Sequence, residues 1–240
     1  AAGLKPAAVV IVATIRALKM HGGVAKADLA KPDTAALEKG FANLKTHIEN
    51  VAKFGLPAVV AVNKFITDTD EEIALLEKLC RDNGSTAVLS EGWEKGGEGA
   101  ADLARTVAEI ADSGKADYHP LYELDLPLAD KIRTIAKEIY RAADVEFDSA
   151  ALKKLKIFED AGYGKLPVCI AKTQNSISHD SKLIGAPSGY TFPVRDVQLY
   201  AGAGFVVALA GDIMTMPGLP KAPAALNIDV DDNGVIHGLF

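Results

Sequence analysis

Apolar runs of strand length alternate with stretches of helical period through the first half of the chain. The stretch from 33 to 54 places Leu37, Phe41 and Leu44 at spacings of three and four, which is one face of a helix. Strands that alternate with helices need crossover connections, so the pattern predicts an α/β fold with a parallel sheet and flanking helices. The predicted strands are 8–12, 57–62 and 87–89, and the predicted helices are 33–54, 70–83 and 100–112.

After Gly114 the regular alternation stops. Two helical patterns follow each other directly, and three apolar runs of strand length come after them. From residue 211 onward Pro and Gly interrupt the chain, which predicts an irregular C-terminal tail. The predicted helices of this half are 127–143 and 149–161, and the predicted strands are 166–171, 194–199 and 205–209.

The first predicted strand has an unusual position. Its nearly continuous apolar run is typical of a central strand that is buried on both faces of a sheet, yet only a few residues precede it. The start, Ala1 to Lys5, has no initiator Met and none of the basic and apolar segments of a signal peptide. We therefore expect a partial chain of a larger protein.

Composition narrows the class of protein. Of the 240 residues, 49% are hydrophobic and 24% charged, so the chain can bury a sizeable core. A net charge of −6 argues against nucleic-acid or anionic-membrane partners, and no apolar run approaches the roughly 20 residues of a membrane helix. Cys80 and Cys169 lie far apart and in no metal-binding pattern, so we expect both to be buried in a reducing, cytoplasmic setting.

The loops after the strands are the first places to look for function, because ligands of parallel sheets bind beyond the carboxyl ends of the strands. Asn63 and Lys64 follow the second strand, as in the base-reading Asn-Lys-x-Asp corner of P-loop nucleotide-binding proteins. Asp68, however, comes five residues after Asn63 rather than three. A polar turn at the strand end is therefore the stronger interpretation of this motif alone.

Two aromatic residues lie in polar loops just past strand ends. Phe65 follows the second strand, and Trp93 follows the third strand within a Gly-rich loop. Adjacent parallel strands would bring the two loops together, so the rings could clamp a flat heterocycle by stacking. The alternative is that both rings cap the edge of the sheet as part of the core.

A third loop, after the strand at 166–171, is rich in hydrogen-bond donors. Lys172, Thr173 and Gln174 open it, and they could hold a phosphate, a carboxylate or the edge of an adenine. The alternative is an ordinary hydrogen-bonded surface loop. The histidines show no spacing typical of metal ligands, and no Gly-Lys-Thr or Gly-Lys-Ser phosphate-binding loop occurs anywhere in the chain.

Several segments read together resemble the formate–tetrahydrofolate ligase family, in order and over essentially the whole chain. They are VATIRALKMHGG (12–23), FGLPAVVAVNKF (54–65), WEKGGEG (93–99), AKTQ (171–174), GYTFPVRD (189–196), MTMPGLP (214–220) and GLF (238–240).

The resemblance implies a reaction. In this family ATP phosphorylates formate to formyl phosphate, and the formyl group passes to N10 of tetrahydrofolate, which releases phosphate. Mg²⁺ accompanies ATP, a monovalent cation is used, and a cytoplasmic homotetramer is usual. The resemblance also implies a fold related to the P-loop NTPases, with the triphosphate site in an N-terminal portion that this chain lacks.

The resemblance also implies roles for particular residues. Phe65 and Trp93 match the aromatic clamp for the pterin ring, and Leu89 belongs to the same pocket. Residues 1–45 would be the tail of the nucleotide-binding domain and 46–240 the C-terminal domain. No catalytic residue and no metal ligand is assigned within the chain. Further residues that could line the active site are Arg16, Lys19, Asn63, Lys64, Lys172 and Thr173.

Two alternatives stay open on the sequence. The chain could be a non-catalytic fragment that keeps only folate-binding or oligomer contacts. It could instead belong to another P-loop-related ligase or GTPase relative, which would bind nucleotide but not folate.

Overall fold

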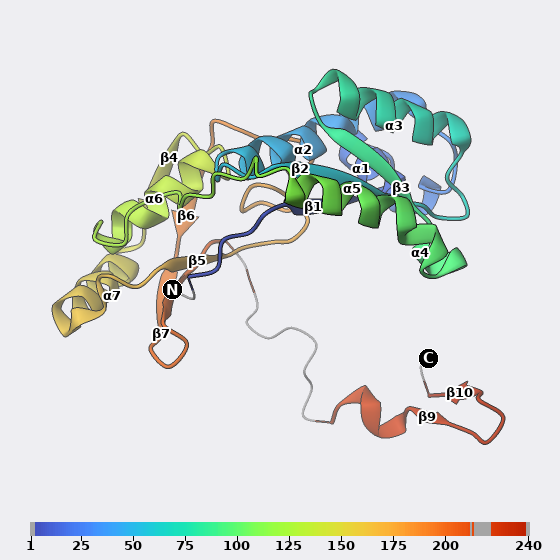
Figure 1. Ribbon diagram of the computed structural model, residues 1–240. Coiled ribbons are helices and arrows are strands. Elements are labelled where there is room, and N and C mark those ends of the chain that lie inside the picture. The colour runs from blue at the N-terminus through green and yellow to red at the C-terminus, as the bar shows by residue number, and fades with distance from the viewer. Residues whose placement is uncertain (1–2, 212, 214–221, 239–240) are drawn as a thin grey trace.

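The computed structural model describes residues 3–211, 213 and 222–238 (Figure 1). Within these residues the chain builds two hydrophobic cores, one under each of two groups of strands and helices. We call the part with residues 9–112 the first lobe and the part with residues 128–209 the second lobe. The motif at 214–220 and the closing residues 239–240 lie outside the described residues.

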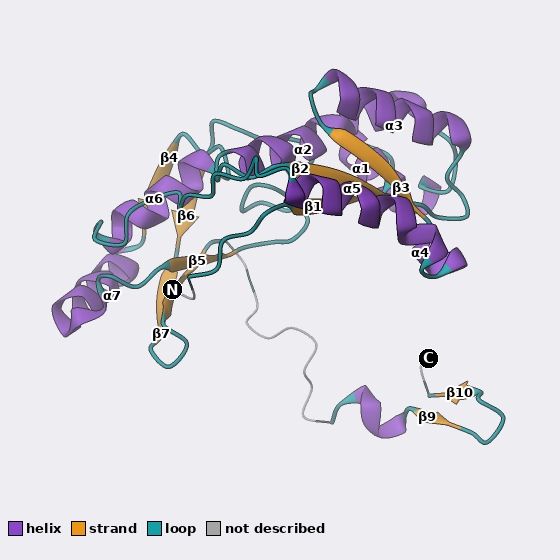
Figure 2. Ribbon diagram, in the orientation of Figure 1, coloured by secondary structure: helices purple, strands orange, loops and turns teal. Residues whose placement is uncertain are grey.

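The first lobe is built on a three-stranded parallel sheet in the order β1-β2-β3, which confirms the predicted α/β class. Helices flank this sheet (Figure 2). The predicted strands and helices follow the predicted order, and α1 and α4 are helices that were not predicted. The strands are β1 (Val9–Ala13), β2 (Ala58–Asn63) and β3 (Thr86–Ser90). The helices are α1 (Ile15–Gly22), α2 (Thr34–Ala52), α3 (Asp70–Asp82), α4 (Gly92–Lys95) and α5 (Ala101–Asp112), with single 3₁₀ turns η1 (Lys26–Asp28) and η2 (Glu98–Ala100).

The prediction that the first strand is central and buried on both faces is wrong for the described sheet. β1 pairs only with β2 there, and it forms the edge of the sheet. Val10 and Val12 point to the same face and are 39% and 66% exposed. Successive side chains of a strand point to opposite faces, so only one face of β1 contributes to the core.

Capping side chains and close packing explain where the helices of the first lobe lie. The Asp33 carboxylate accepts a hydrogen bond from the Ala36 backbone N–H at 2.8 Å, which caps the N-terminus of α2. α1 and α2 approach each other at two glycines. A Cβ atom on Gly40 would lie 1.8 Å from the Leu18 carbonyl oxygen, and one on Gly22 would meet Ala36 in the same way. Any larger side chain there would force the two helices apart.

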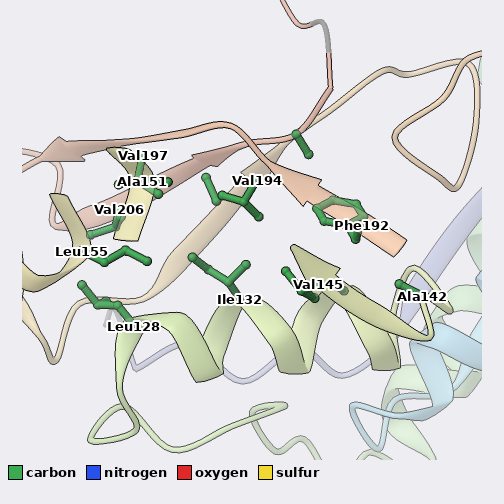
Figure 3. Close-up of a cluster of buried hydrophobic side chains, with 13 residues drawn as sticks. Leu128, Ile132, Ala142, Val145, Ala151, Leu155, Phe192, Val194, Val197 and Val206 are labelled. Atoms are coloured by element: carbon green, nitrogen blue, oxygen red, sulfur yellow. The ribbon is translucent and has the colours of Figure 1, made fainter. Parts of the chain in front are cut away.

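The second lobe packs its helices on two small groups of strands. Figure 3 shows its core, to which Leu128, Ile132 and Phe192 contribute. β4 and β6 form a parallel pair, and β8 lies between parallel β5 and antiparallel β7. The elements are α6 (Leu128–Glu138), β4 (Asp144–Phe147), α7 (Ser149–Phe158), the π turn η3 (Glu159–Tyr163), β5 (Val168–Ala171), β6 (Thr191–Val194), β7 (Asp196–Tyr200) and β8 (Phe205–Leu209).

Two predictions for the second lobe need correction. The helix predicted over 127–143 ends at Glu138, and β4 follows it. Arg141 has a φ of 62°, a left-handed conformation that cannot continue a helix. The strand predicted over 194–199 is two strands, because the chain leaves β6 at Val194 and enters β7 at Asp196.

Hydrogen bonds from α2 join the two lobes. The Asn50 amide donates to the Ile139 carbonyl oxygen at 2.9 Å, and the Thr46 hydroxyl accepts from the Arg141 guanidinium at 2.9 Å. The proposed domain boundary at residue 45 falls inside α2, and it stays a prediction.

The last described segment contains a 3₁₀ turn and a short antiparallel hairpin, within the predicted irregular tail. They are η4 (Ala224–Asn227), β9 (Asp229–Val230) and β10 (Ile236–His237). Cys80 is buried as expected, but Cys169, on β5, is exposed, which corrects the prediction for this residue. Among the described residues, no helix has the length and apolar character required to span a membrane.

Candidate functional site

The carboxyl ends of β2 and β3 form one loop cluster, as their predicted adjacency required. The Lys64 backbone N–H donates to the Ser90 carbonyl oxygen at 3.1 Å, which continues the pairing of the strands into the loops. The Trp93 indole Nε1 then donates to the Lys64 carbonyl oxygen at 2.8 Å. The Trp93 ring is therefore fixed beside the residue that precedes Phe65.

Neither aromatic ring is packed into a core. Phe65 is 36% exposed and Trp93 is 62% exposed, and neither belongs to the buried clusters of the described residues. Leu89 is half-buried and packs against the core of the first lobe. This arrangement argues against the alternative that the rings only cap the sheet, because both keep surface that a ligand could cover.

The backbone turn at Phe65 is held by a buried carboxylate. Asp68 accepts from the Phe65 backbone N–H at 2.8 Å, and its own N–H returns to the Phe65 carbonyl oxygen at 3.0 Å. Burial raises the pKa of Asp68, although the bond from the Phe65 N–H acts in the opposite direction. One oxygen of Asp68 thus fixes the turn at Phe65, while its other oxygen is buried without a hydrogen-bond partner among the described residues.

Arg16 reaches this cluster from the first strand–helix unit. Its guanidinium carbon lies 5.2 Å from the centre of the Phe65 ring, the geometry of a cation–π contact. Arg16 lies in the first turn of α1, just past the end of β1. The loops after all three strands therefore meet at Phe65 and Trp93.

A charged bridge forms the polar side of the cluster. The Glu91 carboxylate contacts Lys64 at 3.0 Å and Lys95 at 2.6 Å. Hydrogen bonds from Lys95 and then Lys64 lower the pKa of Glu91, and the bond to Glu91 raises the pKa of Lys64. Beside this bridge lies a hollow of about 370 Å³ that Leu89 and Arg105 also line. Sequence reasoning missed Glu91, although its position two residues before the only Trp was a signal.

Three of the remaining predicted site residues lie elsewhere, and one lies in the cluster. Asn63 ends β2, half-buried, and its amide has no hydrogen-bond partner among the described residues. Lys19 is completely buried, and its ammonium contacts the Glu72 carboxylate at 2.8 Å. Lys172 and Thr173 follow β5 in the second lobe. The structure thus brings Arg16, Asn63, Lys64, Phe65, Leu89 and Trp93 together. It pairs Lys19 with Glu72 and places Lys172 and Thr173 in the second lobe.

The fold and the loop cluster define a class of protein: a mixed α/β protein with an open, aromatic-rimmed loop cluster at the carboxyl ends of its three-stranded parallel sheet. The chain belongs to the formate–tetrahydrofolate ligase family, whose model matches residues 1–240.

Curated relatives with that description align along the whole chain. Those of Granulibacter bethesdensis and Allorhizobium ampelinum are each 58% identical over 239 residues, and that of Roseobacter denitrificans is 54% identical over 239 residues. Each alignment covers 100% of this chain but only 42% to 43% of the relative. The chain thus spans less than half the length of the curated relatives it matches.

Proposed function

We propose that this chain is the C-terminal portion of an ATP-dependent ligase that joins formate to tetrahydrofolate, and that it supplies the pterin-binding pocket. The observation that carries the proposal is the pair of exposed rings, Phe65 and Trp93, held at neighbouring strand ends by the hydrogen bond from Trp93 to Lys64. Membership of the family supports the reaction.

The proposed pocket binds a flat, partly polar ring. Phe65 and Trp93 offer aromatic faces for stacking, and Leu89 adds an apolar wall between the two loops. The free amide of Asn63 and the ammonium of Lys64 supply hydrogen bonds to the polar edge of the ring. Arg16 supports Phe65 from the side of α1.

The proposed reaction has two steps. ATP phosphorylates formate, which gives formyl phosphate and ADP. The N10 atom of tetrahydrofolate then attacks the formyl carbon, the bond from that carbon to the phosphate oxygen breaks, and 10-formyltetrahydrofolate and phosphate result. The chain contains no Gly-Lys-Thr or Gly-Lys-Ser sequence, so its own residues do not fit Mg²⁺-bound triphosphate. We assign that site, and the activation of formate, to the remaining portion of the polypeptide.

Further parts of the proposal rest on the family alone. They are a fold related to the P-loop NTPases, the tail of a nucleotide-binding domain over residues 1–45, a C-terminal domain with the folate pocket over 46–240, a monovalent cation, a homotetramer and a cytoplasmic location. The match to the formate–tetrahydrofolate ligase family argues against the alternative of another P-loop-related family. A non-catalytic, folate-binding or oligomer-forming chain is the outcome that the experiment below distinguishes.

The test is substitution of the clamp in the full-length polypeptide. Trp93→Ala should weaken tetrahydrofolate binding by roughly 1–3 kcal/mol, because one stacking face is lost. Phe65→Ala should act in the same direction. KM for tetrahydrofolate should rise while KM for ATP stays unchanged, since the triphosphate site lies elsewhere.

Ile66→Ala is the matched control, because Ile66 follows Phe65 in the same loop and is 87% exposed. Its KM for tetrahydrofolate should equal that of the parent. An unchanged KM in Trp93→Ala would remove the pocket from this loop cluster. Tetrahydrofolate binding without any ligase activity in the full-length parent protein would favour the non-catalytic alternative.

A further inference from the structure

A second cavity lies between the lobes and shares no residue with the pterin clamp. Its volume is about 480 Å³. One wall comes from α1 and α2 of the first lobe, and the other comes from the end of α6 and the loop after β5. Its polar lining residues are His21, Asn43, His47, Asn50, Lys172, Gln174 and Ser176.

Basic groups from three elements meet in this cavity. His21 comes from α1, His47 from α2 and Lys172 from the loop after β5. None of the fourteen lining residues is Asp or Glu. The chain as a whole carries a net charge of −6, so a cavity with basic groups and no carboxylate stands out electrostatically.

The Lys172 ammonium is held in place by neutral groups. It donates to the Thr173 carbonyl oxygen at 3.0 Å and also to the Ser176 carbonyl oxygen, and it lies 5.0 Å from the centre of the Tyr140 ring. Burial lowers the pKa of Lys172 to about 8. An ammonium has three donors, so one donor remains after these two bonds. No carboxylate contacts this ammonium among the described residues.

The two histidines add donors that face the same space. The His21 Nδ1 atom accepts from the Gly185 backbone N–H at 3.1 Å, so the proton of the neutral ring resides on Nε2. His47 has no hydrogen-bond partner among the described residues. Burial, and then the charge of its basic neighbour, lowers the pKa of each ring: the neighbour of His21 is His47, and the neighbour of His47 is Lys172.

We propose that this cavity is a second ligand site, which binds the oxyanion of a small molecule against Lys172, His47 and His21. A phosphate or a carboxylate would accept the free donors and relieve the mutual repulsion of the basic groups. The other walls, from Phe54, Ile139 and Tyr140, are apolar or aromatic, so the ligand carries an apolar part beside its anionic group. This inference does not rest on the pterin pocket.

The experiment titrates phenyl phosphate, benzoate and inorganic phosphate into the full-length polypeptide by calorimetry, with ADP and Mg²⁺ present to saturate the proposed nucleotide site. Phenyl phosphate should bind more tightly than inorganic phosphate because of the apolar walls. Comparison of phenyl phosphate with benzoate distinguishes a phosphate ligand from a carboxylate ligand.

Lys172→Gln and His47→Gln should each weaken binding of the tighter probe at least about tenfold, since each replaces a basic donor with an amide that cannot carry a positive charge. Lys182→Gln is the matched control: Lys182 is exposed in the same connection between β5 and β6 and does not line the cavity. Equal affinities in all three variants and the parent would overturn the proposal, as would the absence of binding by every probe.

A local measurement keeps the test valid if Lys172→Gln fails to fold. Diethyl pyrocarbonate modifies accessible neutral imidazoles, and mass spectrometry of peptides reports each histidine separately. Saturating phenyl phosphate or benzoate should slow the modification of His47 at least about fivefold, while the exposed His119, which lies outside this cavity, reacts at an unchanged rate. Modification of His47 at the same rate with and without probe would contradict the site.

Discussion

Each lobe buries one lysine completely, and the two lysines have different partners. In the first lobe, the Lys19 ammonium contacts the Glu72 carboxylate at 2.8 Å, and both side chains are 0% exposed. In the second lobe, the Lys131 ammonium donates to the carbonyl oxygens of Gly164 and Leu166 at 2.7 and 3.0 Å. No carboxylate contacts Lys131 among the described residues.

The difference shows two ways to tolerate a buried charge. Glu72 also accepts from the backbone N–H groups of Asp33 and Thr69, so the pair ties α1 and α3 to the loop before α2. Burial raises the pKa of Glu72, but the hydrogen bonds from Lys19 and the backbone outweigh it and lower the pKa overall. Burial lowers the pKa of Lys131, against the raising effects of Glu159 and Asp125. In the first lobe a carboxylate neutralises the buried ammonium of Lys19, whereas in the second lobe only carbonyl oxygens bond the ammonium of Lys131.

The largest expected effect comes from removing the balanced charge. Lys19→Met leaves the Glu72 carboxylate buried without its counter-ion, which should destabilise the first lobe by about 3–5 kcal/mol. The free energy of local opening can be measured by native-state hydrogen exchange in peptides that cover α1 and α3. Full-length protein is used, because global unfolding of several domains need not be two-state.

The control is a lysine–carboxylate ion pair on the surface. Lys78 contacts Asp82 at 2.6 Å within α3, but the two side chains are 62% and 50% exposed. Lys78→Met should change the opening free energy by no more than about 0.5 kcal/mol. A loss below about 1 kcal/mol in Lys19→Met would show that the buried pair contributes no more than a surface pair.

The next effect tests the lobe without a counter-ion. Lys131→Met removes the donor from two carbonyl oxygens but leaves no buried charge behind. Gly164 and Leu166 are only half-buried, so water can reach these oxygens in part, and the loss should be about 1 kcal/mol. Hydrogen exchange in α6 peptides measures it. A loss as large as that of Lys19→Met would mean that counter-ions do not decide the difference between the lobes.

Much of the fold could be predicted from local patterns. β8 has the predicted bounds, and the alternation of strands and helices in the first lobe follows from hydrophobic period alone. The end of α6 could not be predicted, because it depends on the left-handed backbone conformation of Arg141. Nothing in the sequence marks this arginine as a residue that adopts it. The edge position of β1 depends on which strands pair, and pairing partners are not encoded in the run of apolar residues itself.

The candidate site divides in the same way. The proximity of Phe65 and Trp93 followed from the rule that neighbouring parallel strands end at the same edge. The position of Lys19 did not, because its partner Glu72 lies 53 residues away and only the tertiary fold brings them together. Spacing along the chain therefore predicted the location of residues that directly follow strands. It did not predict the location of a residue such as Lys19, whose counter-ion comes from another helix.

The smallest expected effect is a pH dependence that is specific to Lys131. Because the folded-state pKa of Lys131 lies below its ordinary value of 10.5, the unfolded chain binds more protons between these two values. Stability should therefore rise with pH through this window.

The neutral amine of Lys131 keeps two N–H donors, so the bonds to Gly164 and Leu166 persist while the cost of burying a charge disappears. The difference in α6 opening free energy between the parent and Lys131→Met should grow from about pH 7 to about pH 10. A difference that stays constant, or shrinks, would show that Lys131 is not held at a lowered pKa, and the contrast between the lobes would then reduce to their hydrogen bonds.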